Sequence, residues 1–159
     1  MRFFSMAGGV LLLQLVTLVS AAASSRYFDI PEWPGDEESC PSPGDIKNNL
    51  GIFSSPAKSS GVVWTGVLLD GGKDDVVAFK KGIFLLGEEG SKTQGFLSSC
   101  VYLTAEGRYL NMRLDLGKKY AEMMWITHSS RWKKSPSVRE ARVLECTETG
   151  KYACGFFLN

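Results

Sequence analysis

Hydrophobic and polar residues alternate along most of the chain after residue 60, with the two-residue period that is typical of β-strands. The clearest example is the segment 109–116, in which Leu110, Met112, Leu114 and Leu116 are predicted to share one face. Turns rich in Gly, Asp and Ser separate such segments at short spacing. We therefore predict seven strands, over residues 61–69, 75–86, 94–104, 109–116, 119–127, 137–147 and 151–158.

This pattern predicts an all-β fold, a single antiparallel sandwich or partly open barrel of about seven strands. Gly82 lies inside the second predicted strand and is interpreted there as a β-bulge. The segment 119–127 also fits a short amphipathic helical turn, but its end, Ile126-Thr127, favours a strand.

A different pattern precedes the strands. Ser42-Pro43-Gly44-Asp45 has the form of a helix capping box with proline at the first helical position, and Gly51 stands where a helix-terminating glycine is expected. We predict a helix over 42–50. A helix of two turns is not stable alone in water, so Ile46 and Leu50 are predicted to pack against the domain.

The first residues indicate export. Arg2 precedes an apolar run from Val10 to Val19, which is too short to cross a bilayer, and small residues follow at Ala21–Ala23. We interpret residues 1–23 as a signal peptide rather than a buried N-terminal helix. The predicted location is the periplasm or the cell exterior, and the mature chain is predicted to have no membrane span.

Residues 24–39 are both acidic and aromatic, and two prolines interrupt them. We interpret them as an extended arm before a disulfide-stabilised β domain at 40–159. The apolar residues of the arm are predicted either to lie along the domain surface or to bind a partner; they are Tyr27, Phe28, Ile30 and Trp33.

Charge argues against nucleic acid as a partner. The chain has 18 basic and 17 acidic residues, and residues 1–23 hold one basic residue, Arg2, and no acidic one. The mature chain therefore has 17 of each and is formally neutral. A neutral chain has no general attraction for nucleic acid or anionic membranes.

Four cysteines all lie after the predicted cleavage site: Cys40, Cys100, Cys146 and Cys154. In an oxidising compartment an even number predicts two disulfides, and no pair has the spacing of a zinc site. Cys146 and Cys154 are predicted to face each other in a hairpin centred on Gly150, which leaves Cys40 for Cys100. Loop-closure entropy does not distinguish the three possible pairings, so the hairpin is the only basis for this assignment.

The residues offer little catalytic chemistry. His128 is the only histidine, it stands in a polar segment, and no nucleophile elbow is present. Three adjacent acidic pairs are interpreted as solvated turn charges, and none has the spacing of a calcium loop. They are Glu37-Glu38, Asp74-Asp75 and Glu88-Glu89. We predict no catalytic residue, metal site or cofactor.

A basic segment at 128–139 is the strongest binding candidate. Trp132 lies there among cations and without an acidic neighbour, an arrangement that would grip an acidic protein surface or an anionic glycan. The alternative is that Trp132 packs into the core and the loop is simply solvated. The acidic arm has the opposite charge and is predicted to dock on this segment. The candidate binding residues are Trp132, Arg131, Lys133, Lys134 and Trp33.

The order of several short motifs resembles a family of small exported bacterial proteins that carry a domain of unknown function. The motifs are the Cys-Pro start "CPSPGDIK", Gly51-Ile52-Phe53, Trp64-Thr65-Gly66, the "CVY" that begins at Cys100, and two closing cysteines. The acidic arm is not part of that pattern. The resemblance implies export and a bacterial origin, and it carries no activity.

The sequence thus favours an exported, non-catalytic binding module that contacts another protein, as an inhibitor or a secreted virulence factor. Two alternatives remain open. A small hydrolase would require His128 and two carboxylates in one cleft, and a small-ligand carrier would require a large apolar cavity in the barrel.

Overall fold

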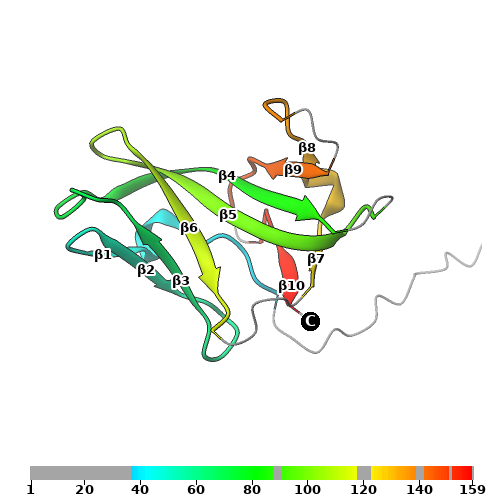
Figure 1. The fold of residues 1–159 in the computed structure, drawn as a ribbon, viewed down its shortest axis with the longest axis horizontal. Coiled ribbons are helices and arrows are strands. Elements are labelled where there is room, and N and C mark those ends of the chain that lie inside the picture. The colour runs from blue at the N-terminus through cyan, green and yellow to red at the C-terminus, as the bar shows by residue number, and fades with distance from the viewer. Residues whose placement is uncertain (1–36, 88–90, 118–122, 139–141, 151, 159) are drawn as a thin grey trace, which may run out of the picture. The chain divides into compact units, whose positions relative to one another are not determined.

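The computed structural model describes residues 37–87, 91–117, 123–138, 142–150 and 152–158 (Figure 1). These residues all belong to one compact unit, Pro31–Asn159. The predicted signal peptide, the arm as far as residue 36 with Trp33, and the pair Glu88-Glu89 lie outside the described residues.

The described residues form ten strands, all paired antiparallel: β1 (Lys47–Asn49), β2 (Ile52–Pro56), β3 (Val63–Val67), β4 (Val76–Leu86), β5 (Gln94–Thr104), β6 (Tyr109–Asp115), β7 (Met124–Ile126), β8 (Lys133–Lys134), β9 (Val143–Cys146) and β10 (Phe156–Leu158). The sheet runs β1-β2-β3-β6-β5-β4-β9-β8, and β10 joins it through β7, which pairs with β5. Figure 1 shows β4 and β5 as the long central hairpin.

The all-β antiparallel class predicted from the sequence is confirmed, but the number of strands is wrong. Among the described residues β1 and β8 are the two ends of the sheet and do not pair, so the sheet is not closed. The two-sheet sandwich is not confirmed. Only two short 3-10 helices accompany the strands within these residues, η1 (Pro43–Asp45) and η2 (Ser129–Arg131). The described part of the chain has no helix long and apolar enough to cross a membrane.

Four strand predictions match closely: β5 has the predicted bounds, and β3, β4 and β6 lie inside theirs. β7, β9 and β10 are shorter than the predicted segments, while β1, β2 and β8 were not predicted. The alternation in β6 is confirmed, because Leu110 and Met112 are buried while Tyr109, Asn111 and Arg113 are exposed. The bulge at Gly82 is wrong: Gly82 pairs in register with Cys100, and β4 shifts register elsewhere.

The helix predicted over 42–50 is also wrong. Ser42 makes no side-chain cap hydrogen bond, η1 lasts a single turn, and the chain then pairs as β1 with β2. Asn48 and Asn49 are poor helix formers, and strand pairing supplies the backbone hydrogen bonds that a two-turn helix would lose to water. Ile46 packs against the core as predicted, but Leu50 is exposed.

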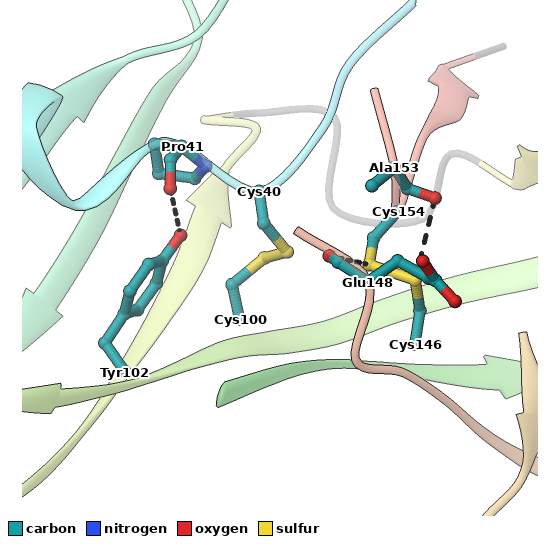
Figure 2. The surroundings of a disulfide bond; sticks show 8 residues. All are labelled: Cys40, Pro41, Cys100, Tyr102, Cys146, Glu148, Ala153 and Cys154. Carbon is teal, nitrogen blue, oxygen red and sulfur yellow. Dashed lines mark hydrogen bonds between the residues drawn. A yellow bond between two sulfur atoms is a disulfide. The ribbon is translucent and has the colours of Figure 1, made fainter. Parts of the chain in front are cut away.

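Both predicted disulfides are present, Cys40–Cys100 and Cys146–Cys154 (Figure 2). The predicted hairpin between Cys146 and Cys154 is wrong, because β10 pairs with β7 rather than with β9. Cys154 reaches Cys146 from the turn before β10 instead. Gly82 on β4 is the register partner of Cys100 on β5 and of Cys146 on β9. The two disulfides therefore lie on the same face of the sheet, on the strands that flank β4, and Gly82 has no side chain between them.

The end of the predicted arm makes an isolated antiparallel β-bridge to β10. The backbone N–H of Glu38 donates to the carbonyl of Phe156 at 2.8 Å, and the N–H of Phe156 returns a bond to Glu38 at 2.9 Å. Next to it, Tyr102 donates from its hydroxyl to the carbonyl of Pro41 at 2.6 Å (Figure 2). Two residues of β5, Cys100 and Tyr102, therefore hold the segment that follows the arm.

Candidate functional site

Trp132, the central residue of the predicted basic site, lies in the core. Its side chain is 5% exposed, and its ring packs against Phe84 with centroids 5.6 Å apart. Gly82 makes this possible, because a Cβ on Gly82 would lie only 3.1 Å from the indole. Trp132 therefore does not present its ring at the surface, which corrects the predicted aromatic centre of this site.

The cations around Trp132 have a structural explanation. Lys133 and Lys134 are exposed on β8, the two-residue strand at one end of the sheet, and Arg131 is half-buried at the end of η2. Lysines on a short edge strand prevent the edge from pairing with another chain. Trp33, the remaining candidate, lies outside the described residues.

His128 meets one carboxylate among the described residues. Its Nε2 lies 3.8 Å from Oε1 of Glu37, and the Thr127 hydroxyl donates to that same oxygen at 2.7 Å. The last part of the acidic arm thus touches the first residue of the segment 128–139, although the rest of the arm is not described. The two carboxylates that a hydrolase would need around His128 are not gathered there in the described part of the chain.

The adjacent acidic pairs are not simply solvated turn charges. Asp75 is exposed, as expected, but Asp74 is 2% exposed and Glu38 is 1% exposed. The described residues contain no cluster of three or more His, Cys, Asp or Glu side chains that would hold a metal ion. A buried carboxylate needs hydrogen-bond or ion-pair partners, because burying an unpaired charge is costly.

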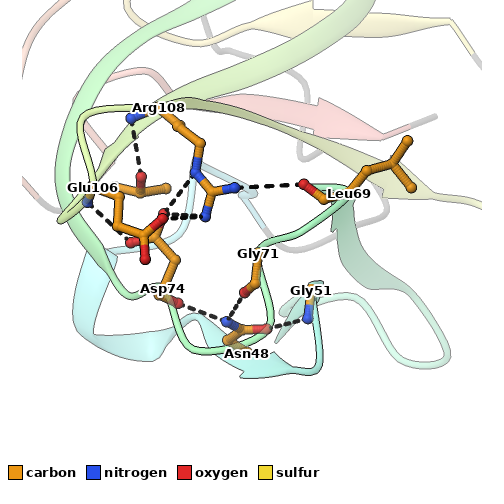
Figure 3. A network of polar contacts seen from close by, with 8 residues as sticks. Asn48, Gly51, Leu69, Gly71, Asp74, Glu106 and Arg108 are labelled. Carbon is orange, nitrogen blue, oxygen red and sulfur yellow. Dashed lines mark hydrogen bonds and ion pairs between the residues drawn. The ribbon is translucent and has the colours of Figure 1, made fainter.

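Asp74 finds these partners in a polar network at the end of β1–β3 (Figure 3). Its Oδ2 accepts hydrogen bonds from Nε and Nη2 of Arg108 at 3.2 and 2.9 Å, and its Oδ1 accepts from the backbone N–H of Glu106 at 3.1 Å. Burial disfavours the charged carboxylate, but hydrogen bonds from Thr104, Arg108 and Glu106, together with the charge of Arg108, outweigh it. The pKa of Asp74 is therefore lowered.

Asn48 extends the network to two turns (Figure 3). Its side-chain amide donates to the carbonyls of Gly71 and Asp74 at 2.7 and 2.6 Å, and its Oδ1 accepts from the N–H of Gly51 at 2.8 Å. Arg108 also reaches the carbonyl of Leu69 at 3.4 Å. The β1–β2 turn and the loop after β3 are thereby fixed to each other.

The β1–β2 turn has two central residues, Leu50 and Gly51, with φ of 53° and 88°. Positive φ at both positions is the geometry of a type I′ hairpin turn, which Asn-Gly favours and leucine does not. Gly51 is required twice over, because a Cβ there would also lie 2.6 Å from the carbonyl oxygen of Leu68. Leu50 thus occupies a strained backbone position without any packing that explains it.

Leu50 is part of an exposed apolar patch. Ile52 and Val67 are direct cross-strand partners. Leu50 lies two residues before Ile52 and Leu69 two residues after Val67, in turns that the hydrogen bond from the Leu68 N–H to the Gly51 carbonyl joins at 2.9 Å. We call these four residues the leucine tip. Their exposed fractions are 84% for Leu50, 56% for Ile52, 66% for Val67 and 84% for Leu69.

Sequence reasoning missed the leucine tip. The sequence places Leu50 on the inner face of a predicted helix and Asp74 in a solvated turn, whereas the structure exposes Leu50 and buries Asp74. Gly51 is a turn residue, but neither Lys47–Asn49 nor Ile52–Pro56 alternates in polarity, so the sequence gives little indication of this hairpin.

Two cavities share the segment that Tyr102 and Cys100 hold as part of their lining. The larger has a volume of about 600 Å³ and the smaller about 240 Å³, and both are lined by Ser39–Ser42 and by Gly150. Lys58 and Tyr152 line the larger cavity, and Phe79 and Glu148 line the smaller one.

The described chain is therefore a two-disulfide, all-β antiparallel domain with an exposed apolar tip. A family model described as "Protein of unknown function (DUF3757)" matches residues 36–157, most of the chain, and the protein belongs to that family. No curated protein and no solved structure matches the chain.

Proposed function

We propose that this protein is an exported, non-catalytic binding module that contacts another protein in the periplasm or outside the cell, and that the leucine tip is its contact surface. This proposal keeps the inhibitor-like or secreted role expected from the sequence. It moves the contact from the basic segment around Trp132 to the tip.

The observation that carries the proposal is the position of Leu50. A leucine that is 84% exposed gains nothing from burial, and at a positive φ it also costs backbone energy. Strained residues persist where the surrounding structure holds them and where function uses them. The hydrogen bonds of the Asn48–Asp74–Arg108 network keep the turn that carries Leu50 in place.

Rigidity of the tip supports the same role. A contact surface that is ordered before binding loses less conformational entropy when the partner arrives. Hydrogen bonds fix the backbone of both turns, so the two leucines are presented by an ordered scaffold. Exposed apolar side chains that cluster in this way are typical of protein contact sites.

The test is quantitative capture with matched variants. Exported wild-type protein, Leu50→Asn and Val77→Thr are immobilised and exposed to periplasmic and extracellular fractions. Val77 is exposed on β4 outside the tip and serves as the control. We expect a specific protein that binds wild type and Val77→Thr and that loses at least tenfold in affinity for Leu50→Asn, which corresponds to about 1.4 kcal/mol. A partner that binds all three equally would contradict the role of the tip.

A further inference from the structure

The strands β1, β2, β3 and β6 lie side by side (Figure 1), and their outward side chains form one continuous face. The pairing register aligns Ile52 with Val67 in one row and Thr65 with Arg113 in the next. Of the ten large apolar side chains that are exposed in the described part of the chain, six lie on this face or at its end. They are Leu50, Ile52, Val63, Val67, Leu69 and Tyr109. We call this surface the Ile52 face, and it contains the leucine tip.

Few charged side chains interrupt the Ile52 face. Among the described outward residues of its four strands, the charged ones are Lys47, Arg113 and Asp115. Arg113 takes part in none of the ion pairs between described residues, so its guanidinium is available to a partner. An apolar surface that includes tyrosine and arginine but few other charges is typical of protein contact surfaces. Monomeric proteins rarely expose so large an apolar patch to water.

The order of side chains along β6 makes the face complementary to itself. Tyr109, Asn111 and Arg113 follow one another at two-residue spacing on the outward side, and Asn111 lies midway between the other two. A two-fold axis that lies between two facing copies and crosses β6 at Asn111 therefore places Arg113 of one copy over Tyr109 of the other, and this contact occurs twice. A guanidinium is attracted to the face of a tyrosine ring. One strand thus supplies both halves of the contact.

The same axis brings apolar residues together on β2 and β3. The register partners Thr65 and Arg113 fix the alignment of β3 with β6. Two residues further along β3, Val67 therefore lies level with Asn111. Ile52 is the cross-strand partner of Val67, so the axis follows the row Ile52, Val67, Asn111. Ile52 and Val67 then each meet their own copy.

The two exposed leucines also meet suitable positions. Leu50 and Leu69 each lie two residues from the axis row, so they approach the positions two residues beyond that row in the other copy. Those positions hold Ser54 on β2 and Thr65 on β3, whose short side chains leave room for a leucine. Sheets that pack face to face lie about 10 Å apart, a gap that side chains fill from both sides.

The charges of the Ile52 face argue against a membrane or a nucleic acid as its partner. Lys47 and Arg113 are balanced by Asp115 and by Asp70, which follows Leu69 at the end of the face. A neutral face has no general attraction for anionic membranes or nucleic acid. Its cation and its aromatic ring are instead spaced to fit a second copy.

We propose that the Ile52 face binds a second copy of this chain in a two-fold symmetric dimer whose axis follows the row Ile52, Val67, Asn111. The contact is isologous, because the same residues act on both copies. The dimer covers the leucine tip, so self-association competes with the partner of the proposed function, but the dimer does not depend on that partner.

Sedimentation velocity of the exported wild-type protein tests the dimer without any foreign partner. We expect a reversible monomer–dimer equilibrium with a dissociation constant between about 1 μM and 1 mM, as for interfaces at the small end of the size range. Val67→Lys should raise that constant at least about tenfold, because it brings two ammonium groups together at the axis. Val138→Lys is the matched control, because Val138 is exposed between β8 and β9, at the other end of the sheet. A wild-type protein that stays monomeric at about 1 mM, or equal effects of the two lysines, overturns the proposal.

Exchange of Tyr109 and Arg113 tests the two-fold arrangement itself. Tyr109→Arg alone places arginine over arginine and should weaken the dimer at least about tenfold. Arg113→Tyr alone removes both contacts between a cation and a ring and should also weaken it. The double variant Tyr109→Arg/Arg113→Tyr restores an arginine over a tyrosine at both places, so its dissociation constant should return to within about threefold of wild type. A double variant that dimerises no better than the single variants overturns the proposal.

Isotope-filtered NMR on a mixture of labelled and unlabelled copies reads the geometry directly. NOEs between the Tyr109 ring of one copy and the Arg113 side chain of the other are expected. A dimer whose intermolecular NOEs all arise at other strands overturns the proposal. The dimer and the proposed function fail separately: a monomeric protein that still captures a foreign partner through Leu50 overturns the dimer alone. A dimer that forms as described while no foreign partner is captured overturns the proposed function alone.

Discussion

Asp74 and Arg108 form a two-bond ion pair in which one carboxylate oxygen accepts from both Nε and Nη2 of the guanidinium, at 3.2 and 2.9 Å. The carboxylate is buried and the guanidinium is partly exposed. Asn48 hydrogen-bonds to the backbone of Asp74 and to that of Gly51, so the ion pair is linked to both turns of the leucine tip.

Asp74→Asn is expected to lower stability at neutral pH, because it removes the charge that Arg108 pairs with. The folded-state pKa of Asp74 is lowered. Its stabilising effect is therefore complete above the unfolded value of about 3.9 and is lost as pH falls through the folded value. Urea denaturation of wild type and Asp74→Asn should differ clearly at neutral pH, and the difference should shrink below about pH 4.

The control for this prediction is the neighbouring residue. Asp75 is exposed, so Asp75→Asn should change the urea midpoint little and should retain the wild-type acid dependence. If Asp75→Asn and Asp74→Asn behave alike, the ion pair does not stabilise this end of the sheet.

Leu50→Asn is expected to stabilise the isolated protein. Asparagine tolerates the left-handed backbone region better than leucine does, and Asn-Gly is the preferred type I′ turn. We expect the free energy of unfolding to rise by about 0.5–1 kcal/mol. Leu69→Asn is the matched control, because Leu69 is equally exposed but has no positive φ. Denaturation should show a gain for the first variant only, and equal effects would argue against backbone strain at Leu50.

The sequence predicted the features that depend on local periodicity. The bounds of β5 and the alternation of β6 follow from residues that are adjacent in the chain. The burial of Trp132 does not, because it depends on the missing side chain of Gly82, fifty residues earlier in the chain. Likewise the burial of Asp74 depends on Arg108, and nothing near Asp74 in the sequence indicates that partner.

The hairpin of β1 and β2 was missed for a related reason. Ser42-Pro43-Gly44-Asp45 does start a helical turn, η1, so the local signal was correct for three residues. The extension to Leu50 failed because β2 offers β1 a strand partner, and pairing outweighed the weak helix preference of Asn48 and Asn49. The candidate site could therefore not be predicted from local sequence, because it depends on the pairing of β1 with β2.

Loss of either disulfide is expected to lower stability by different amounts. The cysteines are 60 residues apart in the first disulfide and 8 apart in the second. Loop-closure entropy gives about 4 kcal/mol for Cys40→Ala/Cys100→Ala and about 2.5 kcal/mol for Cys146→Ala/Cys154→Ala. Chemical denaturation of the two double variants checks the order. A larger loss for the second pair would show that strain or packing, and not chain entropy, dominates.

Gly82→Ala tests the packing between the two disulfides. A Cβ at residue 82 would lie 3.1 Å from the Trp132 ring and 3.3 Å from the Cys40 sulfur, so both neighbours must move. Overpacking of this kind costs about 1–3 kcal/mol. Gly72→Ala is the matched control, because a Cβ there meets no atom within 4 Å. Thermal denaturation should show a lower melting temperature for Gly82→Ala and little change for Gly72→Ala. If Gly82→Ala is as stable as wild type, the indole does not need the space that this glycine leaves, and another cause must hold Trp132 in the core.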